Sequence, residues 1–163
     1  MTSILKVSEI QDPTNDNSAL LIDTSGRVTT PARPFIQLFR NASASYTTDT
    51  TITGFRVNDS RGITYNDTTG VLVAPVAGLY QIGIHVISST SAGINLYIGS
   101  TKIYRIGYAA AGTSESWSHI GGTGVFNLSA SDEVKFTASN ATLTLYGESS
   151  NSTVGGVFMY LLG

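Results

Sequence analysis

Apolar and polar residues alternate with a period of two over much of this chain, and no window has the 3.6-residue period of an amphipathic helix. The clearest alternation interleaves Gln81, Gly83 and His85 with an apolar set, Tyr80, Ile82, Ile84 and Val86. Further short strands are predicted between turn signals, at 35–39, 94–98, 102–106, 124–128, 133–136 and 142–146. The pattern predicts an all-β protein.

The segment 157–162 departs from this alternation because it is apolar at every position. A strand with one face in water alternates, so both faces of this strand must be covered. If one face packs in the core of a sandwich, a second copy of the chain is the expected cover for the other. The residues predicted to lie in the core or at a subunit interface are Tyr80, Ile82, Ile84, Val157, Phe158, Met159, Tyr160 and Leu161.

The first 34 residues form a separate region. Two short apolar stretches, 20–22 and 27–28, flank Asp23–Gly26, which predicts a hairpin. Strands this short do not fold alone in water, so the region is expected to pack on another surface. The chain is therefore divided into an attachment segment, 1–34, and a head, 35–163. The apolar residues expected to anchor the segment are Ile4, Leu5, Val7 and Ile10.

Composition narrows the class of protein. Only 12% of residues are charged and the net charge is −2, which gives no basic surface for nucleic acid. The chain has no cysteine and no run of about 18 apolar residues, so neither thiolate metal sites nor membrane insertion is expected. The opening residues do not read as a secretory signal, so we expect synthesis in a cytoplasm.

The middle and end of the chain resemble the globular head of complement component 1q, a jelly roll shared with tumour necrosis factor. The matching positions are Tyr65, Asn66, Thr69, Gly70, Ala74, Pro75, Gly78 and Tyr80, then Leu128, Asp132, Val134 and Phe136, then Ser152, Gly156 and Met159. The chain departs from the family pattern at Leu72, Ser131 and Val154. The resemblance implies an antiparallel, ten-stranded jelly-roll sandwich that assembles as a tight homotrimer.

The opening of the chain resembles structural proteins of marine and cyanobacterial phages, which often begin with an S-I-L-K-V phrase and continue through I-Q-D and L-I-D. The matching residues are Ser3–Val7, Ile10–Asp12, Leu21–Asp23 and Gly26–Val28. The collagen-like Gly-X-Y repeat common in animal complement 1q proteins is absent before Pro34.

Catalytic and metal-binding groups are sparse. His85 and His119 are the two histidines, and a triad could be drawn through Ser116 or Ser118, but no nucleophile-elbow motif surrounds either serine. The carboxylates near the motif loops, Asp59, Asp67, Asp132 and Glu133, lack the spacing of a calcium loop. We therefore expect no enzyme activity, no cofactor and no metal. The glycine-rich run 121–124 is interpreted as a turn or bulge.

Tyr108 and Trp117 flank a long loop of small residues and are the candidates for a ligand-binding loop. Exposed aromatic rings suit stacking on sugar rings. In the alternative interpretation, Trp117 begins a strand and packs over a sheet edge.

These observations favour a non-enzymatic, trimeric structural protein of a phage virion, made in the host cytoplasm and exposed on the virion surface. It would be a host-adhesion head at a tail or fibre tip, or a capsid decoration knob. Residues 1–30 would bind another virion protein, and the head could bind a glycan or protein of the host surface. The alternative is a bacterial or spore surface adhesion module of the same fold. A carbohydrate-active enzyme lacks the paired acidic residues it needs.

Overall fold

The computed structural model describes residues 7–11, 18–30, 32–109, 117–147 and 155–162. Every element of regular secondary structure in these ranges is a β-strand. The chain divides into two units, Met1–Arg33 and Pro34–Gly163. The described part of the chain contains no helix long and apolar enough to cross a membrane.

The first unit is a three-stranded antiparallel sheet of β1 (Glu9–Gln11), β2 (Ser18–Ile22) and β3 (Val28–Thr29). The predicted hairpin is confirmed, and Asp23 stabilises its turn. One carboxylate oxygen of Asp23 accepts hydrogen bonds from the backbone N–H groups of Ser25 and Arg27, both at 2.9 Å, and the other accepts one from the Arg27 guanidinium at 2.6 Å. The side chains of Val7 and Ile10 are exposed, while the predicted anchor residues Ile4 and Leu5 lie outside the described residues.

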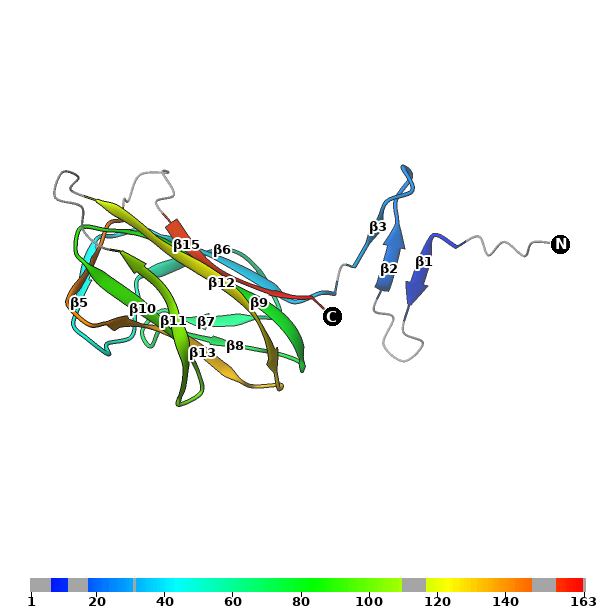
Figure 1. Ribbon diagram of the computed structural model, residues 1–163. Helices are drawn as coiled ribbons and strands as arrows, with labels where there is room; N and C mark the ends of the chain where they lie inside the picture. Colours follow the sequence, from blue (N-terminus) through cyan, green and yellow to red (C-terminus); the bar gives the residue numbers. More distant parts are fainter. Residues whose placement is uncertain (1–6, 12–17, 31, 110–116, 148–154, 163) are drawn as a thin grey trace. The chain divides into compact units, whose positions relative to one another are not determined.

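The second unit is a sandwich of two antiparallel sheets that face each other (Figure 1). The seven-stranded sheet follows the order β5 (Ala44–Tyr46), β14 (Leu143–Leu145), β9 (Gly78–Ser88), β15 (Gly155–Leu161), β4 (Phe35–Arg40) and β6 (Phe55–Arg61), with β12 (Ser118–Leu128) also paired to β9. The five-stranded sheet follows the order β11 (Thr101–Ala109), β10 (Ala92–Ile98), β13 (Glu133–Ser139), β8 (Val71–Val73) and β7 (Thr64–Asn66).

The predicted all-β jelly-roll class is confirmed, and the predicted strands are present. Their ends differ from the predicted ones by at most three residues, except that the strand predicted at 124–128 begins six residues earlier, at Ser118. The described residues of this unit form twelve strands rather than the ten that the resemblance implied. The difference arises because three-residue segments such as β5 and β7 also pair with a neighbour.

The core lies between the sheets and follows the alternation of β9. The side chains of Tyr80, Ile82, Ile84 and Val86 are at most 1% exposed, and Val157 and Met159 of β15 pack in the same core. The opposite positions of both strands point away from the core, because successive side chains in a strand alternate between its faces.

The family-like motif at 65–80 has a physical reason at each position. The Asn66 side chain accepts hydrogen bonds from the backbone of Thr68 and Thr69, both at 3.0 Å, which closes the turn before β8. Gly70 has a φ of +70°, and a Cβ there would lie 2.6 Å from the Ile52 carbonyl oxygen. The Tyr80 hydroxyl donates to the Val76 carbonyl at 2.8 Å, fixing the loop that enters β9.

The turn before β13 tolerates a departure from the family pattern. Ser131, where the family has glycine, has a φ of +70°, a region that L-residues rarely adopt. Asp132 accepts a hydrogen bond from the Ser129 N–H at 2.8 Å, as expected for a turn aspartate, and the Ser131 N–H donates to the Ala74 carbonyl at 2.8 Å.

The interpretation of residues 121–124 as a turn or bulge was wrong. The run lies in the middle of β12, paired in regular register with β9. Its glycines are needed for close packing instead. A Cβ at Gly122 would collide with the Ile106 carbonyl oxygen, and one at Gly124 would lie 2.5 Å from the Tyr104 hydroxyl.

Candidate functional site

The face of the seven-stranded sheet that points away from the core bears a group of half-exposed aromatic rings. Phe35 and Phe39 come from β4, and Phe158 and Tyr160 come from the neighbouring β15. We call these four residues the outer aromatic face. Phe35 and Tyr160 are stacked, with ring centroids 6.0 Å apart, and the Phe158 centroid lies 5.6 Å from that of Tyr160.

The apolar surface extends beyond these rings. On the same face, the side chains of Leu79 on β9 and Val125 on β12 are 48% and 55% exposed, and Leu162 just after β15 is 41% exposed. Singly scattered apolar residues on a surface need no explanation, but a contiguous patch marks an interaction site. The two-sided apolar strand of the sequence therefore has one face in the core, through Val157 and Met159, and one face on this surface.

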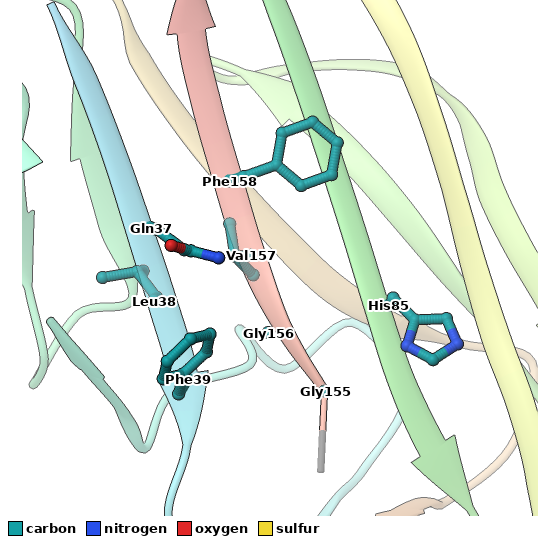
Figure 2. Close-up of a pocket in the computed structure, with 8 residues that line it drawn as sticks. All are labelled: Gln37, Leu38, Phe39, His85, Gly155, Gly156, Val157 and Phe158. Carbon is teal, nitrogen blue, oxygen red and sulfur yellow. The ribbon is translucent and has the colours of Figure 1, made fainter. Parts of the chain in front are cut away.

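A shallow cavity of about 240 Å³ opens beside the outer aromatic face (Figure 2). Its lining comes from β4, β9 and β15 and consists of Gln37, Leu38, Phe39, His85, Gly155, Gly156, Val157 and Phe158. Pockets for small-molecule ligands usually hold at least about 300 Å³. The cavity is therefore better sized for a side chain of another protein than for a drug-sized ligand.

Glycines shape this surface because they let rings lie flat over the sheet. Gly83 is paired with Phe158, and a Cβ at Gly83 would lie 2.6 Å from Cε1 of the Phe158 ring. Gly156 of β15 and Gly121 of β12 are the cross-strand neighbours of His85. His85 therefore stands between two positions without side chains.

The two histidines meet on the same sheet face. Nδ1 of His119 lies 3.2 Å from Nε2 of His85, with ring centroids 5.1 Å apart, and both residues are exposed. His119 is paired with Ile87, so it contacts His85 diagonally across β9 and β12. The ring that could have served a Ser118 triad is hydrogen-bonded to another histidine, and Ser116 lies outside the described residues.

A second group of partly exposed aromatic rings lies where β11 approaches β12. The Tyr104 ring stacks on Phe126 with centroids 5.8 Å apart. The preceding residue of β11, Ile103, is 39% exposed. We call Tyr104 and Phe126 the edge patch. Burial raises the pKa of Tyr104, so its hydroxyl keeps its proton, and it donates a long hydrogen bond of 3.4 Å to the Thr123 carbonyl.

The predicted ligand loop is only partly described, because residues 110–116 lie outside the described residues. Tyr108 is 53% exposed and its ring lies under the Arg105 guanidinium, 5.6 Å from the centroid. Trp117 directly precedes β12, is 40% exposed, and meets the Tyr146 ring edge-on at 5.0 Å. The alternative interpretation, that Trp117 packs at the start of a strand, agrees with this contact, and its role in a ligand-binding loop stays a prediction.

The carboxylates do not gather into a site. Among the described residues, no three or more histidine, cysteine, aspartate or glutamate side chains lie close enough to hold a metal ion together. Asp132 serves the turn described above, and Glu133 lines a second cavity of about 460 Å³ beside the edge strand β7 and its neighbour β8.

Sequence reasoning missed the contact between His85 and His119. The alternation of β9 placed His85 on its polar side, but the register of β12 against β9 decides that His119 lies beside it. The glycine run in β12 was the available signal, because glycines within a strand indicate a close approach by another group.

Solved structures share the architecture of the second unit. Eiger, a tumour necrosis factor of S. frugiperda, has a TM-score of 0.64 at 9% identity, and the match covers 81% of this chain and 94% of that chain. The globular domain of zebrafish complement 1qA has a TM-score of 0.64 at 16% identity and covers 80% of this chain and 98% of that chain. The head has the tumour necrosis factor and complement 1q jelly-roll fold. Murine APRIL at pH 5.0 has a TM-score of 0.58 at 13% identity, and the match covers 80% of this chain and 99% of that chain.

No protein-family profile matches the sequence, and no curated protein matches it. The relationship to the complement 1q and tumour necrosis factor domains is therefore one of fold, because identities this low do not establish a shared ligand or activity.

Proposed function

We propose that this chain is a non-enzymatic structural protein that acts as a homotrimer, with the outer aromatic face buried between copies. The observation that supports this most strongly is the row of half-exposed rings on β4 and β15, on a sheet face that nothing else in the described head covers. Permanent assemblies bury such apolar surface, and the resemblance to complement 1q implies three copies.

The outer aromatic face and the edge patch differ from each other, and this difference favours a closed ring of copies rather than a dimer with two-fold symmetry. A dimer with two-fold symmetry joins one surface to itself, whereas a closed ring joins one surface to a different surface on the next copy. In the trimer that we propose, the outer aromatic face of one copy packs against the edge patch of the next. The cavity beside Phe158 would receive a side chain of that neighbour.

The oligomeric state is tested by light scattering on the purified chain at micromolar concentration. A trimer has a mass of about 52 kDa, three times the chain mass of 17.2 kDa. A mass of one chain would exclude the assembly, and a mass of two chains would favour a self-complementary face.

We place this trimer on the surface of a phage virion. Two observations support this placement. The opening of the chain resembles phage structural proteins, and the first unit, which is separate from the head, exposes the apolar side chains of Val7 and Ile10. In this proposal residues 1–30 bind another virion protein, and the head projects as a host-adhesion tip or a capsid decoration knob. A bacterial or spore surface module is the alternative.

The attachment role is tested with a chain that begins at Pro34. The head has its own core, so we expect it to fold and trimerise but not to join particles. Incorporation at the level of the full chain would overturn the anchor role. An antibody to the head, viewed by electron microscopy, separates label on tails from label on capsids, and unlabelled particles would favour the alternative.

A further inference from the structure

We propose that His85 and His119 form a binding site for a divalent transition metal ion such as Zn²⁺. The chain has two histidines and no cysteine, and the fold brings both imidazoles together from strands more than thirty residues apart in sequence. This inference goes beyond the proposed function, and the first two ligands come from one chain whether or not it trimerises.

The geometry fits a shared ion. Zn–N bonds of about 2.0–2.1 Å in a tetrahedral site place two ligand nitrogens about 3.3 Å apart. Nδ1 of His119 and Nε2 of His85 are 3.2 Å apart. Two imidazoles on one tetrahedral ion would have ring centroids roughly 5 Å apart by the same bond lengths, and the measured separation is 5.1 Å.

The surroundings leave room for an ion and its other ligands. Both histidines are exposed, and Gly121 and Gly156 flank His85 without side chains. Figure 2 shows the His85 ring extending from β9 toward β12, away from the strand that bears Phe158. Water completes the coordination in a single chain, and a side chain of a neighbouring copy could replace it in the assembly.

The chemistry selects the class of ion. Imidazole nitrogen suits zinc, copper and nickel, whereas calcium and magnesium prefer oxygen ligands. Without the ion, one neutral ring donates its N–H to the other. When the ion binds, each neutral ring directs a lone pair at it and keeps its single proton on its other nitrogen. The donor ring therefore changes tautomer, and neutral rings release no proton.

Calorimetric titration of Zn²⁺ into the full chain, made without a polyhistidine tag, tests the site. We expect saturable binding in the wild type and a weakening of more than about tenfold in both His85→Asn and His119→Asn. Asn127→Ala, a change at an exposed position on the same face of β12, should leave binding unchanged. Absence of saturable binding in the wild type, or full binding in either histidine variant, would overturn the proposal.

Three further measurements test the site independently of the trimer. Electron paramagnetic resonance of bound Cu²⁺ should show at least two nitrogen ligands, and a single nitrogen would overturn the shared site. Gly121→Ala keeps both imidazoles but places a methyl group about 3.1 Å from Cδ2 of His85, so binding should weaken. Light scattering on the same samples separates the proposed metal site from the proposed trimer. A monomer that binds the ion would support the metal site and exclude the trimer.

Discussion

The guanidinium group of Arg40 is buried against the phenol of Tyr46, with Nη2 of the arginine 3.0 Å from the tyrosine hydroxyl. Arg40 is 1% exposed, and its Nη1 donates to the Thr53 carbonyl at 2.7 Å. The rings of Tyr46 and Phe55 each lie 5.4 Å from the guanidinium carbon. A buried charge is stabilised here by a carbonyl, a hydroxyl and two aromatic faces.

This arrangement predicts how much two substitutions of Arg40 should lower the free energy of unfolding. Arg40→Ala should cost about 3–5 kcal/mol, because it leaves a large cavity at the end of β4. Arg40→Met should cost less, since it fills much of the space without burying a charge, and the Tyr46 hydroxyl still donates to Thr53 at 2.7 Å. Urea unfolding measures both values. If Arg40→Ala were as stable as the wild type, the buried contacts of the arginine would contribute nothing.

Substitutions on the two faces of β15 should have different effects. Tyr160→Asp places a charge on the outer aromatic face and should prevent trimerisation while the head stays folded. Met159→Asp buries a charge in the core and should unfold the head. Tyr97→Asp is the matched control, since Tyr97 is a half-buried aromatic on the five-stranded sheet. Light scattering and circular dichroism measure assembly and folding. A trimeric Tyr160→Asp protein would contradict the proposed interface.

Two glycines with similar backbone angles should respond differently to alanine. Gly70 and Gly99 have φ angles of +70° and +58°, so each substitution carries a backbone cost of about 1–2 kcal/mol. Only at Gly70 would the new Cβ also meet the backbone, 2.6 Å from the Ile52 oxygen, whereas nothing lies within 4 Å at Gly99. Thermal unfolding should therefore show a clearly larger loss for Gly70→Ala. Equal losses would mean that packing around Gly70 relaxes freely.

The turn at Asp23 should respond to acid. Hydrogen bonds from the Arg27 backbone and side chain lower the pKa of Asp23 below its ordinary value of 3.8. A lowered pKa contributes stability that is present above the ordinary value and is lost as the pH falls through the folded value. We expect the β2–β3 hairpin to loosen only below about pH 4. An NMR titration of the Asp23 and Arg27 signals measures this, and Asp23→Asn should abolish the response.

Host recognition, if the head has that role, should depend on Tyr108 and Trp117. Both rings are exposed and flank the candidate loop, and three copies around one axis would raise the apparent affinity by roughly 100-fold or more. The Tyr108→Ala, Trp117→Ala double variant should lose adsorption to host cells and remain trimeric. Unchanged adsorption by an intact trimer would favour a decoration protein.

Local patterns in the sequence determined the fold class and the core. The period-two alternation in 80–86 identified the buried side of β9 because a strand alternates its side chains regardless of its neighbours. The turn before β8 was equally local, since Asn66 bonds to the backbone two and three residues later. The apolar run 157–162 predicted that both faces of one strand are covered, but it did not indicate which face lies in the core.

The tertiary structure decided the questions that depend on register and on contacts distant in sequence. Pairing of β15 with β9 and β4 places Met159 in the core and Tyr160 on the outer aromatic face. Pairing of β12 with β9 turns a glycine run that looked like a turn into a strand and brings His119 to His85. A one-residue shift in either register would exchange the faces of a whole strand, and no local pattern of residues specifies that choice.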